Sequence, residues 1–310
     1  MDVLTDMLQR SRARGAAFSH STARGAWGVQ FPAGTGAQLA IHGILAGEAF
    51  AWTDDSPHQA RRVVSGDVVL VRGPSLHFMA HAPGADVVPF GGRPTSAPPG
   101  GAAHLAYGSG SGDPTTFFCG AYRFEGDLCG GLLAGLPGLT VVRPLAGSSL
   151  RGALDVFSGE LLQDAPGQQA LLDSLLKVIL VQALREHLAS DVAAAPAWFR
   201  AMSDPGIGAA LRAVHADPQR AWTVADLAAA ASLSRATFAR RFSGLLGVAP
   251  LAYVTDWRMA LAREQLRVGD TGLAAVARSL GYASEFSFAA AFKRHHGIAP
   301  GRWRATATPA

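Results

Sequence analysis

The first 145 residues alternate between short apolar runs and turn-forming residues. Runs such as LAIHGIL, EAFAW, DVVLV and TTFFCGAY are separated by glycine and proline. Short apolar runs with this punctuation are typical of β-strands. The pattern therefore predicts an all-β sandwich or barrel in this part of the chain. Residues 89–112 are rich in Gly, Pro and Ser, and we interpret them as a loop or an edge insertion.

Residues 148–195 change to helical spacing. Apolar residues recur there at intervals of three and four, which places them on one face of a helix. The sequence DAPG at 164–167 divides this segment into two predicted helices. The second helix, at 171–188, is apolar over much of its surface, so it requires a partner. The pattern leaves open whether that partner is the β-domain or a second copy of the chain in a dimer.

The last hundred residues contain an internal repeat. Six residues recur at an offset of fifty, five of them identically and one as an exchange of Tyr for Trp. The first set is Ser234, Phe238, Phe242, Gly247, Pro250 and Tyr253, and the second is Ser284, Phe288, Phe292, Gly297, Pro300 and Trp303. A repeat of this kind predicts two similar structural units in tandem.

Each copy predicts a helix, a short turn and a second helix. The first helix spans 223–231 with Thr223 as its N-cap, and its counterpart spans 272–280 with Asp270 or Thr271 as the cap. A serine then caps the second helix, whose two phenylalanines share the buried face. Glycine ends that helix, and proline prevents its continuation. Helices of this length joined by a short turn are typical of the helix-turn-helix.

The segment between the copies, at 251–267, carries an apolar stripe and predicts one continuous helix. Such a helix would fix the distance between the two units. Their second helices, the recognition helices, would then enter successive major grooves on one face of DNA, roughly 34 Å apart.

The charge of the chain is unevenly distributed. From Asp204 onward there are 13 basic and 7 acidic residues, a net +6, whereas residues 1–203 carry a net −2. A basic C-terminal third favours a nucleic-acid-binding function. No apolar run reaches the roughly 18 residues that a membrane span needs, and the N-terminus does not resemble a secretory signal. We therefore expect a cytoplasmic protein that has no membrane partner.

The C-terminal residues resemble a known family. The stretches WTVADLAAAASLSRATFARRFSGLLGVAPLAYVTDWRMALAREQL and VARSLGYASEFSFAAAFKRHHGIAPGRWR are similar to the DNA-binding domain of the AraC family of transcription regulators. The resemblance covers about a third of the chain. It implies two helix-turn-helix units, double-stranded DNA and RNA polymerase as partners, and a role as activator or repressor of transcription.

In the first recognition helix, Arg240 is the best candidate for reading a base, because arginine pairs bidentately with guanine O6 and N7. The position also matches one at which the family commonly contacts bases. We expect Arg235 and Arg241 to contact phosphate, and we place Thr237 on the same outward side.

The second recognition helix departs from the family pattern. Alanine occupies 289–291, where relatives often have an arginine. Its outward polar residues are Ser284, Glu285 and Ser287, and Glu285 is able to accept a hydrogen bond from cytosine N4. We expect Lys293 and Arg294 to contact phosphate. The first unit is therefore predicted to carry most of the base specificity.

Residues 39–83 resemble a cupin, with a strand, a tight turn at Ala46-Gly47-Glu48, further strands and then His77. The paired His-x-His of metallocupins is missing, so a catalytic metal site is not expected. Two readings of the remaining histidines stay open. His42, Trp52 and His77 would bind a small-molecule effector, or a closed structural Zn²⁺ would be held by His42, His77, His81 and Cys119.

The two cysteines, Cys119 and Cys129, are too few for a disulfide scaffold, and they provide a redox alternative to an effector. The sequence as a whole predicts an α+β protein with a cupin-like β-barrel at 1–147, a helical linker at 148–200 that is the candidate segment for homodimer formation, and an all-α double helix-turn-helix domain at 201–305. The predicted function is a transcription regulator with a sensor domain and no required cofactor. A cupin enzyme and an architectural DNA-binding protein are the alternatives.

Overall fold

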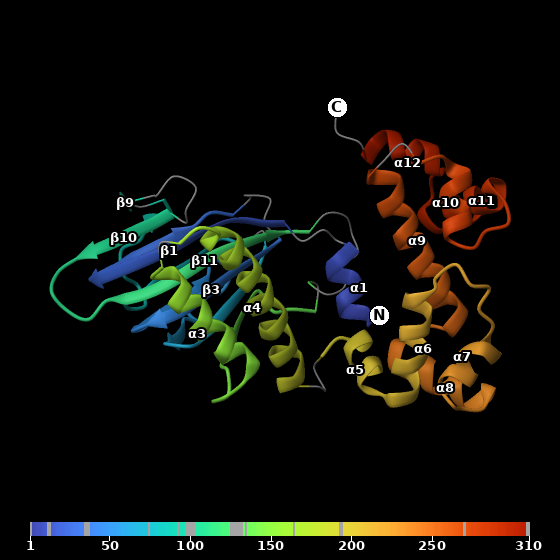
Figure 1. Cartoon of the computed structure of the whole chain (residues 1–310), viewed down its shortest axis with the longest axis horizontal. Helices are drawn as coiled ribbons and strands as arrows, with labels where there is room; N and C mark the ends of the chain where they lie inside the picture. Colours follow the sequence, from blue (N-terminus) through green and yellow to red (C-terminus); the bar gives the residue numbers. More distant parts are fainter. Residues whose placement is uncertain are drawn as a thin grey trace. The chain divides into compact units, whose positions relative to one another are not determined.

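A computed structural model describes residues 2–10, 14–33, 38–73, 75–91, 93–96, 103–124, 133, 135–163, 165–191, 195–268 and 271–307. The chain forms two compact units (Figure 1). One unit contains residues 13–124 and 132–191 and is called here the β unit. The other contains residues 1–12, 125–131 and 192–310 and is called the helical unit. The helices expected as a linker thus belong to the β unit.

Two sheets form the β unit. The seven-stranded sheet has the order β12-β6-β3-β11-β1-β10-β9, and the five-stranded sheet has the order β5-β4-β7-β2-β8. The strands are β1 (Arg14–Gly25), β2 (Gly28–Phe31), β3 (Leu39–Ala46), β4 (Glu48–Thr53), β5 (Arg61–Val64), β6 (Val68–Arg72), β7 (His77–Ala80), β8 (Val88–Pro89), β9 (Arg93–Ser96), β10 (Ala103–Ser109), β11 (Thr115–Arg123) and β12 (Leu139–Val142).

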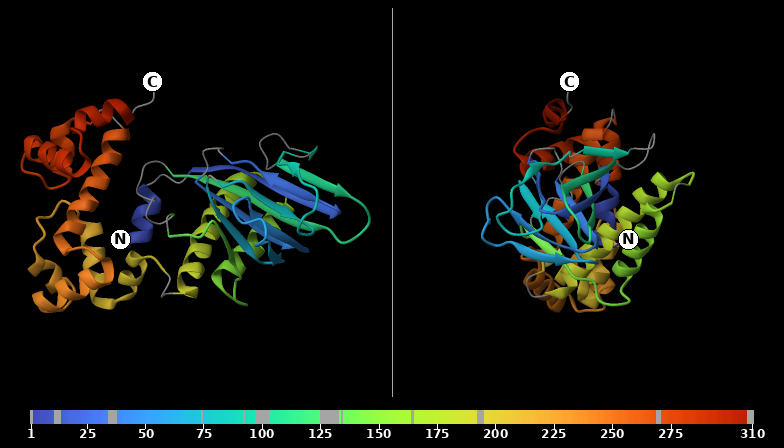
Figure 2. Two further views of the ribbon diagram at one scale, coloured as in Figure 1. Left: turned by 180° about the vertical axis from the view of Figure 1, so that it is seen from behind. Right: turned by 90° about the vertical axis from the view of Figure 1, so that its left-hand side faces the viewer.

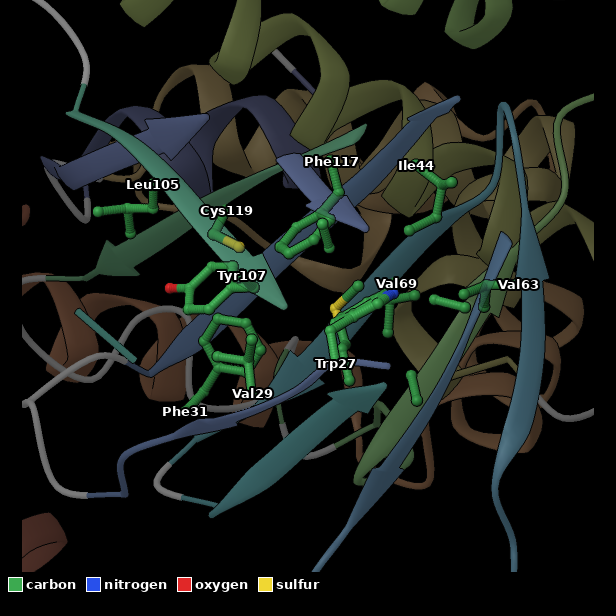
Figure 3. Packing of buried hydrophobic residues seen from close by; sticks show 14 of the residues in the cluster. Trp27, Val29, Phe31, Ile44, Val63, Val69, Leu105, Tyr107, Phe117 and Cys119 are labelled. Atoms are coloured by element: carbon green, nitrogen blue, oxygen red, sulfur yellow. The ribbon is translucent and has the colours of Figure 1, made fainter. Parts of the chain in front are cut away.

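The expected barrel is therefore realised as two sheets, and among the described strands neither sheet closes on itself. The described parts of the segment at 89–112 fit an edge insertion, because β9 is the edge strand of the larger sheet and pairs with β10, while residues 92 and 97–102 lie outside the described residues. Alternate residues of the central strands fill the space between the sheets, as the pleat requires. Rings of Trp27 and Phe117 stack there at 5.5 Å, within the buried cluster of Figure 3.

Helices α3 (Ser149–Leu161) and α4 (Gln168–Ser190) cover the other face of the larger sheet (Figure 2). Phe157 of α3 packs on Phe118 of β11 with the ring centres 4.6 Å apart. A Cβ at Gly120 would lie 2.9 Å from Leu176 of α4, so the glycine allows the helix to approach the strand closely. The apolar side of α4 is thus buried within its own unit.

The helical unit consists of α1 (Val3–Arg10), α5 (Ala197–Ser203), α6 (Pro205–Ala216), α7 (Val224–Ala230), α8 (Arg235–Leu246), α9 (Pro250–Val268), α10 (Leu273–Ser279), α11 (Glu285–His296) and α12 (Pro300–Ala307). The pairs α7–α8 and α10–α11 are the two predicted helix-turn-helix units. The connecting helix α9 is continuous, as expected, and its 19 residues span about 28 Å.

The local signals in the repeat are largely confirmed. Thr223, Ser234 and Ser284 cap their helices, and Gly247 and Gly297 end α8 and α11 with φ of +74° and +78°. The cap predicted for the second copy at Asp270 or Thr271 is wrong. Gly272 is the N-cap of α10, and it offers no side-chain hydrogen bond.

The two prolines of the repeat do more than stop a helix. Pro250 and Pro300 are the first residues of α9 and α12, a position where proline's missing N–H costs nothing. Helix α1 was not predicted from the sequence, and it belongs to the helical unit although β1, next in the chain, belongs to the β unit.

Candidate functional site

The two helix-turn-helix units have the same interior. Phe238 and Phe242 are fully buried in α8 with their ring centres 5.4 Å apart. Phe288 and Phe292 are equally buried in α11 at 5.7 Å. These pairs fix which side of each recognition helix faces solvent, because residues four apart lie on one face.

The exposed side of α8 carries the residues predicted to bind DNA. Arg235, Arg240 and Arg241 are exposed, and Thr237 is half-buried. The Thr237 amide donates to the Ser234 cap. Arg240 is therefore presented as the sequence predicted.

Arg241 has a second role that the sequence did not reveal. Its Nε lies 2.6 Å from Oδ2 of Asp204, a carboxylate that is only 9% exposed. The same Asp204 caps α6 through the amides of Gly206 and Ile207. Arg241 thus ties the recognition helix to α6, and this ion pair competes with the phosphate contact expected of it.

The exposed side of α11 is different. Ser284 and Ser287 are mutually engaged in a capping box, so both hydroxyls already serve the helix terminus. Glu285, Lys293 and Arg294 are exposed. Phe286, which the sequence analysis did not single out, is 80% exposed. Its signal was present in the sequence as an aromatic residue that does not fall on the buried spacing.

Arg258 of α9 connects the two helix-turn-helix units, and the sequence analysis did not identify it. Its Nε donates to the Pro218 carbonyl and its Nη2 donates to the Arg220 carbonyl, both at 2.7 Å. The guanidinium lies 5.9 Å from the ring centre of Tyr282, in the turn before α11. One side chain therefore contacts the loop before α7 and the turn of the second unit.

The turns of the two helix-turn-helix units place different residue types at positive φ. In each turn one residue has positive φ, Ser232 at +55° and Gly281 at +79°. The following amide bonds back five residues in both cases, from Leu233 to Ala228 and from Tyr282 to Ala277. These pairs are offset by 49 residues, so the second copy has its extra residue between the turn and the serine cap.

A polar network supports the first unit from inside. Nδ1 of His215 in α6 lies 2.7 Å from Oδ2 of Asp6 in α1, and its Nε2 lies 2.7 Å from the Tyr253 hydroxyl of α9. Asp6 and His215 are fully buried. A buried carboxylate is stable only with such partners, so α1 is an integral part of the helical unit.

In the β unit, His42 and His77 meet between the sheets. Nε2 of His42 lies 2.8 Å from Nε2 of His77, and Nδ1 of His42 lies 3.0 Å from Sγ of Cys119. Nδ1 of His77 lies 3.2 Å from the Ser75 carbonyl, to which only a protonated nitrogen can donate. One directed chain follows, in which Cys119 donates to His42, His42 to His77, and His77 to Ser75.

Burial keeps every member of this chain neutral. It lowers the pKa of His42 well below its usual value, an effect to which His77 adds, and it lowers the pKa of His77 to about 4. It also raises the pKa of the Cys119 thiol. Because the thiolate is the reactive form, this environment disfavours oxidation of Cys119. Cys129, the other predicted redox residue, lies outside the described residues.

The four residues proposed for zinc are not gathered in one place. His81 is exposed, and its Nδ1 lies 3.0 Å from the amide nitrogen and 2.8 Å from the carbonyl oxygen of Trp27. Both ring nitrogens of His42 are engaged by Cys119 and His77. Across the described part of the chain, no group of three or more His, Cys, Asp and Glu side chains is arranged to hold a metal ion.

The three residues proposed to bind an effector are also divided. Ala49 and Ala51 of β4 belong to the core between the sheets, so Trp52 points to the opposite face and stacks on Phe78 at 5.4 Å. There Trp52 lines a cleft of about 150 Å³. Polar side chains dominate its wall, among them Asp55, Gln59 and Arg61. Trp52 pairs with Phe78 of β7, the residue next to His77. Because successive residues of a strand face opposite sides of the sheet, Trp52 and His77 do not share a site.

The comparisons with known proteins agree with this architecture. A family model described as "Cupin" matches residues 2–189, and one described as "Helix-turn-helix domain" matches residues 227–306. An AraC-like transcription regulator of Streptomyces antibioticus is 33% identical over 98% of each chain. The transcriptional regulator AlkR of Acinetobacter baylyi is 27% identical over 98% of this chain and 99% of its own.

Among solved structures, the DNA-binding domain of AdpA in complex with a target DNA aligns at 33% identity. The alignment covers 33% of this chain and 92% of that chain, with a TM-score of 0.31. In the described part of this chain, no helix is long and apolar enough to cross a membrane. From the two matched domains and the full-length relatives, the chain belongs to the AraC-like transcription regulators, with a cupin domain followed by a DNA-binding helix-turn-helix domain.

Proposed function

We propose that the protein recognises a specific DNA sequence through both helix-turn-helix units, and that a small molecule bound by the cupin unit controls this activity. The observation that carries the first part is the pair of recognition helices presented on one unit, with Arg240 and Phe286 exposed on them. The names of the relatives describe transcription regulators, which supports a regulatory and not a catalytic role. RNA polymerase is then the partner through which transcription would rise or fall.

The test is selection of genomic fragments by the purified full-length chain at a stated, near-physiological salt concentration. We expect a shared site with two short elements about one helical turn apart. A site with only one element would contradict the use of both units. No enrichment over random DNA, with and without candidate effectors, would contradict sequence-specific binding.

The cleft beside Trp52 supports the second part of the proposal. It combines an aromatic surface with acidic, amide and basic side chains, which suits a small polar ligand. The interior around His42 and His77 is filled by aromatic rings, with Phe31 stacked 4.8 Å from His77. A ligand reaches the cleft without displacing the core, and we therefore place the effector there.

A ligand screen by thermal shift tests this placement. A polar ligand that stabilises the wild-type chain should lose its effect in Arg61→Ala, and the exposed control His58→Ala should retain it. The ligand should also change the affinity for the selected DNA site, because control requires different affinities for two states. A ligand that binds equally well to Arg61→Ala would contradict the site.

A homodimer completes the proposal. Leu171 and Val178 are each 45% exposed, and they lie seven residues apart on the outer side of α4, two turns along one face. Light scattering at micromolar concentration should give a dimer for the wild type and a monomer for Leu171→Glu with Val178→Glu. A wild-type monomer would exclude this part of the proposal.

A further inference from the structure

The second recognition helix presents an apolar face to solvent. Phe286 is 80% exposed at the second residue of α11, whereas Phe288 and Phe292 of the same helix are fully buried. Ala290 is exposed as well, and it lies one turn beyond Phe286 on the same face. Leaving a phenylalanine in water forgoes the stabilisation that its burial would give, so the packing of the unit does not explain its position.

The repeat sharpens this observation. At the offset of fifty, Phe286 corresponds to Ala236, and Ala290 corresponds to Arg240. All four residues are exposed. The first unit thus presents a small residue and then a hydrogen-bond donor, and the second presents a large apolar residue and then a small one.

The surroundings of Phe286 favour DNA as its partner. Lys293 and Arg294 are exposed towards the end of the same helix, where they suit the phosphate backbone. The N-terminal part of a recognition helix is the part that contacts base edges in the major groove. The one apolar group that a base presents in that groove is the C5 methyl of thymine, and phenylalanine is among the side chains that contact it.

We propose that Phe286, with Ala290 beside it, is the specificity-determining element of the second unit, and that it contacts thymine C5 methyl groups. This inference rests on the proposed DNA-binding function. It also accounts for the missing arginine, since Ala290 leaves space next to the phenyl ring for a methyl group, whereas a long charged side chain would occupy that space.

Deoxyuridine provides a direct test, because it differs from thymidine only in lacking this methyl. The affinity of the full-length chain is measured by fluorescence anisotropy on the selected site, with each thymine of each element replaced in turn. In the element read by the second unit, we expect one or two replacements to weaken wild-type binding about four-fold each, the value for one buried methyl.

Phe286→Ala should bind the thymine and uracil sites equally, whereas Phe286→Leu should retain part of the difference. Replacement of thymines in the first element should affect the wild type and Phe286→Ala alike. Circular dichroism checks that the variants are folded, which we expect because the side chain is on the surface.

Three outcomes would overturn the inference. One is a wild-type chain that binds a two-element site without any methyl dependence in the second element, which leaves the proposed function standing. Another is a thymine preference that survives in Phe286→Ala. The third is a variant that reads DNA normally but loses self-association, because Phe286 would then face a protein. Failure of the wild type to select any DNA site would overturn this inference and the proposed function together.

Discussion

The two helix-turn-helix units have nearly the same interior and different exteriors. In the first, Phe242 meets Tyr253 edge-on at 5.7 Å and 77°, and in the second, Phe292 meets Trp303 at 6.3 Å and 72°. Outside, the arginines of α8 contrast with Phe286 and Ala290 of α11. The pair shows that a repeat preserves the residues that hold the fold, while its exposed positions are free to diverge in chemistry.

The largest expected effect concerns the two turns. A Cβ at Gly281 would lie 2.0 Å from the Gln219 carbonyl oxygen, whereas Gly297 has positive φ with nothing within 4 Å. We expect Gly281→Ser to lower the free energy of unfolding of the helical unit by on the order of 3 kcal/mol and Gly297→Ser by on the order of 1 kcal/mol. Urea unfolding followed by circular dichroism measures both. Equal losses would show that the close approach is not decisive.

The reverse exchange completes that test. Ser232 already accommodates a side chain at positive φ in the first turn. Ser232→Gly should therefore change the free energy of unfolding by less than either glycine substitution. A large loss for Ser232→Gly would indicate that its side chain stabilises the turn in a way the second unit lacks.

The buried network of the first unit carries the next effect. Asp6→Ala removes the carboxylate that lies 2.7 Å from His215 and should destabilise the helical unit by about 2 kcal/mol, the cost of leaving a buried polar group without its partner. Asp256→Ala, at a carboxylate that is 53% exposed, is the control and should change little. If α1 does not support the first unit in solution, the two variants will unfold at the same urea concentration.

Base reading by the first unit depends on Arg240. Arg240→Ala should lower affinity about ten-fold for the selected sequence and relax the preference at one base pair. Arg235→Ala should instead weaken binding uniformly and reduce the slope of the salt dependence by about one. Competition binding against sites changed one base pair at a time separates the two patterns. A uniform loss for Arg240→Ala would assign that side chain to phosphate.

The smallest effect concerns the spacing between the units. Arg258→Met removes both hydrogen bonds to the Pro218 and Arg220 carbonyls and keeps the aliphatic stem. We expect binding to the selected site to weaken about three-fold, less than for Arg240→Ala, because the lost hydrogen bonds lie within the protein and act on DNA binding only through the spacing of the two helix-turn-helix units. The variant should also discriminate less against sites with one base pair inserted between the elements. The exposed Arg278→Met is the control, and unchanged spacing discrimination in Arg258→Met would exclude this role.

Much of the helical unit was predictable because its signals are local. Serine and threonine caps, a pair of phenylalanines four residues apart and a glycine at positive φ each act within one or two helical turns. The repeat doubled these signals. The prediction of the N-cap of α10 was wrong because residue type alone shows that Asp270 or Thr271 is able to cap a helix, not that it does. The structure has Gly272 at this position.

The candidate sites were less predictable because their geometry depends on residues far apart in the chain. The sequence marked His42, Trp52 and His77 without revealing that Trp52 faces away from the other two. It marked Arg241 as basic, but not as the partner of Asp204, which lies 37 residues earlier. The spacing of Phe288 and Phe292 already placed Phe286 off the buried face, and the structure showed that its side chain is 80% exposed.

The amino-acid sequence was enough to predict the two helix-turn-helix units and the continuous helix between them, because periodicity and capping report directly on local structure. Only the folded chain shows that α1 joins the helical unit through Asp6 and His215, which are 209 residues apart, that the described strands form two sheets, and that α4 packs on its own sheet. The physical reason is the same in each case: a pattern shows that a residue needs a buried or polar partner, and only the folded chain selects which partner is within reach.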